Sequence, residues 1–151
     1  MMLRLRAAID RWFRLETING GGLCATYMYR WTLLAIGHWR VYLHHFVASD
    51  WSRDPHDHPK AFLSIGLCGS YLEFDYRNLD RPRRIRWTAP WIRRFPATHR
   101  HRIELDPGGS CWTICVVGKP VRDWGFWYHR RRWVRWDAYV HTGPGAEQRD
   151  C

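Results

Sequence analysis

The chain has 151 residues, of which 46% are hydrophobic and 25% are charged. This length and composition predict a single globular domain with a sizeable core, and they exclude a disordered protein. No stretch of about 20 apolar residues occurs, which excludes a transmembrane helix. Residues 1–9 lack the apolar segment and the small-residue cleavage site of a secretory signal. We therefore expect a cytoplasmic protein with no membrane partner.

The net charge is +10, and all but two of the 24 basic residues are arginine. Arginine and the 11 tryptophans together could neutralise phosphates and stack on bases, so a nucleotide or nucleic acid is one candidate partner. The plainer interpretation, which we favour, is that arginine keeps a Trp-rich β protein soluble and blocks edge pairing, because the charge is spread along the chain. In both cases the charge attracts a small anionic substrate.

The five cysteines are odd in number and include no CxxC pair. This excludes a disulfide framework and a zinc ribbon, and it agrees with an intracellular protein. Cys111 and Cys115 lie in an apolar run, where we expect them to act as small buried hydrophobic residues.

The first 18 residues predict an amphipathic helix, because apolar side chains are mixed with arginines at near-helical spacing. The Gly-rich segment at 19–22 ends this pattern, so residues 1–22 form the first predicted segment. A basic amphipathic helix can bind membranes or nucleic acid, but packing against its own domain is the commoner outcome.

Residues 23–141 predict an all-β domain, since short segments rich in Tyr, Trp, Val, Ile and Thr alternate with turn signals. Such regular strands are typical of an antiparallel sandwich or barrel. We expect residues 142–151 to be a disordered tail. The predicted strands cover residues 25–36, 40–47, 61–67, 70–76, 83–88, 91–95, 102–105, 111–118 and, with a turn inside, 124–136.

Two histidine pairs carry the clearest chemical signal. His56 and His58 are two positions apart, as are His99 and His101. Side chains at this spacing on a strand point to the same face. Imidazole is a common ligand for zinc, iron, copper and nickel. Either pair alone could consist of ordinary structural histidines, but two such pairs favour a metal site.

These pairs resemble the two motifs of the cupin superfamily, which are small β-barrels of the jelly-roll type. His56 and His58 match the histidine pair of the first motif, and Gly69 matches its closing glycine. Pro96 and His101 match the proline and the last histidine of the second motif. The resemblance implies a single jelly-roll β-barrel after the N-terminal helix, with His56, His58 and His101 as metal ligands.

The chain departs from the first motif because Phe62 occupies the position of its glutamate ligand. A cupin site of three histidines resembles that of the thiol dioxygenases. It implies Fe(II) as the metal, with Zn, Ni or Mn as alternatives, and an iron-dependent dioxygenase that oxidises a small anionic molecule. Those enzymes bind the substrate carboxylate with an arginine and hold a tyrosine near the iron. Here the resemblance makes Arg40 the candidate arginine and Tyr42 the candidate tyrosine. His99 is a candidate fourth ligand, base or substrate contact.

Carboxylates near the first histidine pair are candidates to hold a ligand imidazole by its second nitrogen. Asp50 and Asp54 lie close to this pair in the sequence, whereas Asp57 alternates with the two histidines and is expected at the surface. Glu73 shares a strand face with Tyr71, and the sequence alone assigns neither a role.

The segments 42–46, 56–59, 96–101 and 124–136 also resemble small cupin-like proteins of bacteriophages and prophages. This supports an alternative function, in which the protein captures a nucleotide or nucleic acid through Arg and Trp surfaces and the metal is structural or absent. Isomerisation or hydrolysis at the same metal site is a third hypothesis. Cupins often pair through an edge strand, so a homodimer is one expectation.

Overall fold

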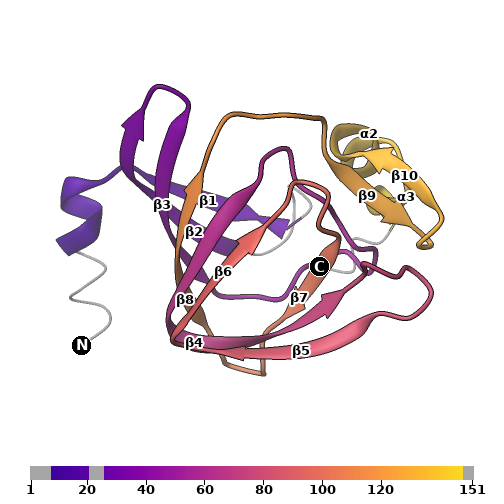
Figure 1. The fold of residues 1–151 in the computed structure, drawn as a ribbon, viewed down its shortest axis with the longest axis horizontal. Coiled ribbons are helices and arrows are strands. Elements are labelled where there is room, and N and C mark those ends of the chain that lie inside the picture. The colour runs from indigo at the N-terminus through magenta and orange to yellow at the C-terminus, as the bar shows by residue number, and fades with distance from the viewer. Residues whose placement is uncertain (1–7, 21–25, 148–151) are drawn as a thin grey trace.

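The computed structural model describes residues 8–20 and 26–147, and these residues form a mostly β protein (Figure 1). Each strand predicted from residue 26 onward has a counterpart within a few residues, which confirms the β class of the fold. The strands are β1 (Leu15–Asn19), β2 (Thr26–Ile36), β3 (Trp39–Phe46), β4 (Phe62–Asp75), β5 (Arg83–Thr88), β6 (Trp91–Phe95), β7 (His101–Glu104), β8 (Cys111–Val117), β9 (Gly125–Tyr128) and β10 (Arg132–Arg135). The helices α2 (Trp136–His141) and α3 (Pro144–Glu147) follow them.

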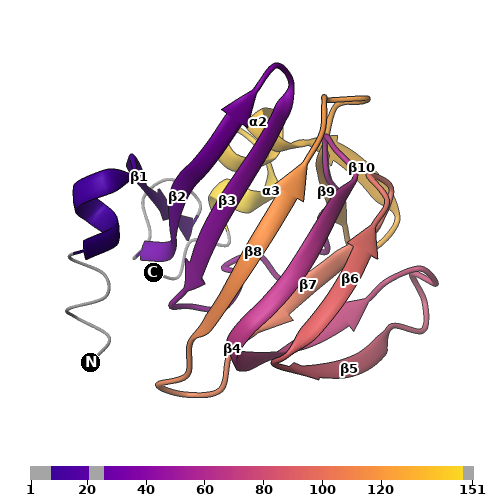
Figure 2. The ribbon, with the colours of Figure 1, turned by 60° about the vertical axis from the view of Figure 1, so that its left-hand side comes forward.

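An antiparallel sheet of eight strands forms the body of the molecule, in the order β1-β2-β3-β8-β4-β5, with β6 and β7 also paired to β4 (Figure 2). Strand β4 is continuous, although a turn at 68–69 was predicted to divide it. Its first half pairs with β6, and its second half pairs with β5 and β7. A bulge after Gly66 and a positive φ of 84° at Gly69 bend the strand between the halves. The sheet therefore curls around an internal cavity lined by β2, β3, β4, β7 and β8.

The N-terminal prediction is corrected by the structure. Residues 8–12 are helical, but residues 15–18, which the periodicity placed in the same helix, belong to the edge strand β1 (Leu15–Asn19). The free edge of β2 offers these residues a ladder of backbone hydrogen bonds, and this pairing overrides the local helical pattern. The short helix packs nearby, where Asp10 accepts a 2.7 Å hydrogen bond from the buried indole of Trp31. The predicted boundary at residue 22 lies outside the described residues.

The C-terminal part forms a small unit on one end of the sheet. The predicted turn within 124–136 is confirmed by the β9–β10 hairpin. Residues 136–141, predicted as the end of the β domain, are helical, and Tyr139 in α2 is fully buried against Phe126, with their ring centroids 4.1 Å apart. Residues 144–147 form α3 within the segment that was expected to be disordered, and residues 148–151 lie outside the described part.

Two further expectations concern the membrane and the cysteines. None of the helices in the described residues is long and apolar enough to span a bilayer. Cys68, Cys111 and Cys115 are free thiols, and Cys111 and Cys115 are buried as predicted. Burial raises the pKa of both buried thiols to about 12, so they serve as packing groups and not as thiolate nucleophiles.

Gly66 marks a point of tight packing in β4. A Cβ atom at this position would lie 2.3 Å from the indole ring of the buried Trp91. We expect Gly66→Ala to lower the free energy of unfolding by about 1–3 kcal/mol, as overpacking of a core does. Urea unfolding would measure the loss. Gly118→Ala is the matched control, because its Cβ would have no neighbour closer than 3.7 Å; equal stability of the two variants would contradict the argument.

Candidate metal centre

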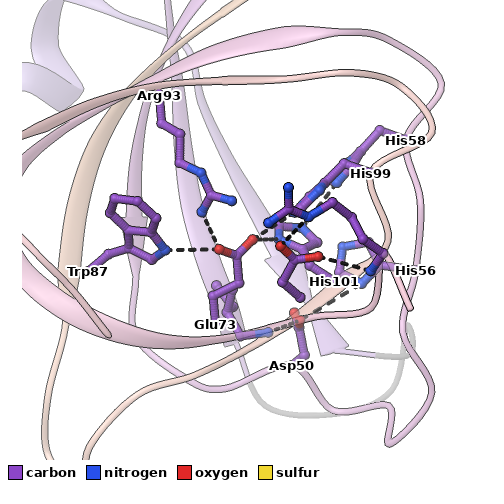
Figure 3. A network of polar contacts seen from close by, with 11 residues as sticks. Asp50, His56, His58, Glu73, Trp87, Arg93, His99 and His101 are labelled. Atoms are coloured by element: carbon purple, nitrogen blue, oxygen red, sulfur yellow. Dashed lines mark hydrogen bonds and ion pairs between the residues drawn. The ribbon is translucent and has the colours of Figure 1, made fainter. Parts of the chain in front are cut away.

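Three histidine side chains converge at one end of the internal cavity (Figure 3). His56 lies between β7 and β9, and its backbone exchanges two 3.0 Å hydrogen bonds with His101. The amide of His58 donates to the carbonyl of Ala97 at 3.0 Å. One nitrogen from each of the three rings lies within 4.8 Å of the other two, and the Nε2 atoms of His58 and His101 are 3.0 Å apart. The structure thus brings together the three histidines that the cupin resemblance selected.

The segment that carries His56 and His58 is not a strand, although the spacing argument assumed one. Single backbone hydrogen bonds to neighbouring segments keep it extended, so the alternation of side chains survives without a full ladder. His99 does not join the three-histidine group. Its ring packs beside that of His101 and belongs to a second cluster, which Glu73 completes.

Glu73 is the central carboxylate of the site, and the sequence alone did not identify it. Its side chain is fully buried on β4. Oε1 accepts hydrogen bonds from Nε2 of His99 at 2.8 Å and from Nδ1 of His101 at 3.0 Å. Oε2 accepts from the indole of Trp87 at 2.9 Å and from the guanidinium of Arg93.

This network keeps Glu73 ionised. Burial alone would raise the pKa of its carboxyl group, but the hydrogen bonds from His101, His99 and Arg93 hold that pKa far below its usual range. The Glu73 carboxylate accepts a hydrogen bond from the N–H group at Nδ1 of His101. The lone pair of the His101 ring is therefore on Nε2, which points toward His58. This carboxylate–histidine pairing is the usual support of a metal-bound imidazole.

Two aspartates support the other histidines. Asp50 Oδ2 lies 3.8 Å from Nδ1 of His56 and accepts a 2.7 Å hydrogen bond from the backbone of Ile103. Asp57 points away from the histidines, as its alternation predicted, but it is only 1% exposed and not at the surface. It accepts hydrogen bonds from the Gly125 amide at 2.8 Å and the Trp133 indole at 3.1 Å, which tie the histidine loop to the β9–β10 hairpin.

The donor set fits a divalent transition metal. Burial, only partly offset by the nearby Asp50 carboxylate, lowers the pKa of His56 to about 4. Burial, followed by the effect of neighbouring histidines, also lowers the pKa of His58 well below its usual value. Both imidazoles are neutral at pH 7, so their lone pairs are free to bind a metal. Two imidazole nitrogens about 2.1 Å from one metal at a right angle are about 3 Å apart, which matches the separation between His58 and His101.

The cavity beside the histidines has a volume of about 550 Å³ and a mainly aromatic and aliphatic lining. Tyr42 lines it, but Arg40 does not. Arg40 lies at the outer end of β3, beside the β2–β3 hairpin, and its guanidinium donates to the carbonyls of Gly37 and Trp39.

Arg30 supplies the arginine of the cavity. It pairs across β2 and β3 with His44, and its guanidinium lies 4.9 Å from the centre of the Tyr42 ring. Two of its nitrogens also contact Oε2 of Glu16, at 2.6 and 2.9 Å. Lys60 is a second cation of the lining and has no ion-pair partner among the residues that the structure describes.

His44 gives the metal-free protein a pH-dependent stability. Burial and then the nearby Arg30 charge lower the pKa of His44 to about 3, and its Nε2 has no hydrogen-bond partner in the described residues. In the unfolded chain the His44 imidazole is protonated near pH 6.5, whereas in the folded protein it stays neutral until about pH 3. The free energy of unfolding is therefore highest above pH 6.5 and falls as the pH drops toward 3. Between pH 6.5 and 4, we expect the His44→Phe variant to lose about 2–3 kcal/mol less free energy of unfolding than the parent. Urea unfolding at several pH values would measure it; parallel pH curves for variant and parent would contradict the assignment.

Comparisons with known proteins identify the fold. No protein-family model matches the sequence, and no curated protein sequence matches it either. Among solved structures, the polyketide cyclase RemF from Streptomyces resistomycificus superposes with a TM-score of 0.58 and 15% identity, over 91% of this chain and 93% of its own. A sugar phosphate isomerase of the cupin superfamily from Silicibacter pomeroyi gives 0.53 and 14%, over 82% and 69%. The fold is that of the cupins.

The Fe(II) form of HppE is a further cupin-fold neighbour, with a TM-score of 0.56 and 10% identity over 71% of this chain. The chain spans a little over half the length of HppE, 57%. At these identities the likeness extends to the fold alone. RemF and the sugar phosphate isomerase are named for different activities, so the reaction of this chain has to be argued from its own site.

Proposed function

We propose that this cupin-fold protein is a metal-dependent enzyme that oxidises a small anionic molecule with dioxygen. His56, His58 and His101 hold the metal, for which Fe(II) is the first candidate. The observation that carries the proposal is the convergence of three imidazoles, those of the buried His101 and the half-buried His56 and His58, on a cavity large enough for a small organic substrate. A bound Fe(II) with three neutral ligands would keep open positions for a chelating substrate and dioxygen.

The protein's own residues supply binding and orientation. Lys60, which has no ion-pair partner among the described residues, attracts the anionic group of the substrate into the cavity. Arg30 and Tyr42 line the same cavity and offer further hydrogen-bond donors to it. In this proposal Arg30, and not Arg40, takes the part of the anion-binding arginine.

Glu73 and His99 act as positioning residues. Glu73 fixes the orientation and tautomer of the His101 ring through the Nδ1 hydrogen bond. His99 contacts the same carboxylate oxygen from the other side and lies outside the three-histidine group. The apolar lining, which includes Phe62 and Phe95, restricts water around the reacting groups.

Oxygen uptake tests the proposal. Metal-free protein is loaded anaerobically with either Fe(II) or Zn(II) and then mixed with dioxygen and a panel of small thiols, carboxylic acids and phosphonic acids. We expect uptake for at least one compound with Fe(II), and none with Zn(II) or with His58→Ala protein. Stoichiometric iron binding without uptake for any compound would overturn the oxidation step and favour a zinc-dependent isomerisation or hydrolysis, assayed on the same panel.

A further inference from the structure

A second, open groove of about 900 Å³ lies on the far side of Glu73 from the metal centre. Strands β5 and β6, the 96–100 segment and the start of the β9–β10 hairpin line it. Trp87 and Arg93, which contact Oε2 of Glu73, belong to this lining, whereas His101, on Oε1, lines the internal cavity (Figure 3). The buried Glu73, together with His99 on its Oε1 atom, therefore lies between the two sites. Six arginines belong to the lining of the groove, namely Arg77, Arg83, Arg93, Arg94, Arg100 and Arg122.

Three of these arginines are neutralised by buried carboxylates. Arg77 lies 2.8 Å from Asp75, Arg122 lies 3.0 Å from Asp57, and Arg93 pairs with Glu73. No carboxylate lining the groove remains unpaired in the described part of the chain, since Asp57 is its one acidic lining residue. Three positive charges are therefore left over.

The remaining three arginines present these charges to the groove. Arg83 and Arg94 are exposed, and their guanidinium groups have no hydrogen-bond or ion-pair partner within residues 8–20 and 26–147. Arg100 donates a 2.8 Å hydrogen bond to the carbonyl of Arg77, which does not cancel its charge. Guanidinium groups match the oxygen geometry of phosphate and bind it through paired hydrogen bonds. A cluster of this kind favours an anion with several oxygen atoms.

The groove also holds two indole rings. The Arg93 guanidinium lies 4.3 Å from the centre of the Trp87 ring, and that of Arg100 lies 4.9 Å from the centre of Trp127. Indole rings and stacked guanidinium planes are platforms for flat bases. The buried Nε1 of Trp127 has no hydrogen-bond partner in the described residues. The groove is also far larger than one phosphate group requires, so a ligand that joins a phosphate to a flat ring fits both its charge and its size.

We infer that this groove binds a mononucleotide, with its phosphate on Arg83, Arg94 and Arg100 and its base beside Trp87 and Trp127. The site is independent of the metal centre and of the oxidation proposed there. It gives the arginine and tryptophan of this face a binding role beyond solubility.

Isothermal titration at 150 mM NaCl tests this inference, with AMP, inorganic phosphate and a ten-residue oligothymidylate as probes. We expect saturable binding of AMP, at least tenfold tighter than that of inorganic phosphate. The variant Arg83→Gln/Arg94→Gln should weaken AMP binding by about tenfold or more, because it removes two charged donors. The matched control is Arg84→Gln/Arg131→Gln, which removes the same charge from exposed arginines outside the groove and should bind AMP as the parent does.

Three results would overturn the inference. The first is no AMP binding at millimolar concentration by protein that is folded by circular dichroism. The second is an equal loss of affinity in both double variants, which would show a general effect of net charge. The third is binding of the oligothymidylate more than tenfold tighter than that of AMP, which would make a nucleic-acid strand the ligand.

Discussion

His58→Ala protein, purified without a histidine tag, is expected to contain no bound transition metal, whereas the parent protein contains close to one metal ion per chain. His58 contributes the nitrogen that lies 3.0 Å from Nε2 of His101. Removing it leaves two imidazole ligands and an opening in the apolar lining beside Phe62. Loss of one of three protein ligands should lower metal affinity by more than the roughly 10–100-fold that follows loss of a supporting contact. Plasma mass spectrometry on both proteins measures the content.

His44→Ala is the matched control for this measurement. It removes an imidazole from the wall of the same cavity, but His44 does not belong to the three-histidine group. Its metal content should equal that of the parent. A metal content that falls equally in both variants would show a general loss of cavity structure, and parent protein that takes up no metal would refute the metal centre itself.

Glu73→Gln is expected to have the largest effect on stability, with the free energy of unfolding lower by about 3–5 kcal/mol. The substitution preserves the volume of the side chain but removes the charge that balances Arg93, whose side chain is only 17% exposed. It also replaces one of the two acceptor oxygens with an amide NH2 group, which then faces either the two imidazoles on Oε1 or the Trp87 and Arg93 donors on Oε2. Urea unfolding of the metal-free protein measures this change.

The same variant should bind metal about 10–100-fold more weakly, because the His101 ring loses its support. Glu104→Gln provides the control for both measurements. Glu104 pairs with Arg102 but its side chain is 36% exposed, so its removal should cost less than about 1 kcal/mol and leave metal affinity unchanged. A Glu73 variant as stable as the Glu104 variant would show that the buried network does not stabilise the fold.

The two histidine pairs were predictable because the relevant information is local, whereas the grouping of His101 with His56 and His58 followed from the cupin resemblance. A spacing of two residues places His56 and His58 together, and likewise His99 and His101, and the backbone keeps this alternation even where no strand forms. The strands after residue 26 were predictable for a similar reason, since short β-rich segments between turn signals can be recognised without knowing which strands they pair with.

Glu73 was not predictable in the same way. Its side-chain partners lie between 14 and 28 positions further along the chain, so its role depends on how three other segments pair. The same holds for the arginine of the cavity. Alternation with Tyr42 selected Arg40, whereas the register between β2 and β3 places Arg30 opposite His44 and in the lining of the cavity. Leu15–Asn19 is a strand for the same reason, because only the free edge of β2 makes extended pairing better than a helix there.

The tie between Asp57 and the C-terminal hairpin has a consequence for how the protein is made. Asp57 is held by Gly125 and Trp133, which follow it by 68 and 76 positions. During translation, His56 and His58 leave the ribosome well before this hairpin has been synthesised, and the loop that carries them lacks this particular brace until then. We therefore expect the proposed metal site to become complete late in biogenesis, in a nearly finished fold and not in the nascent chain.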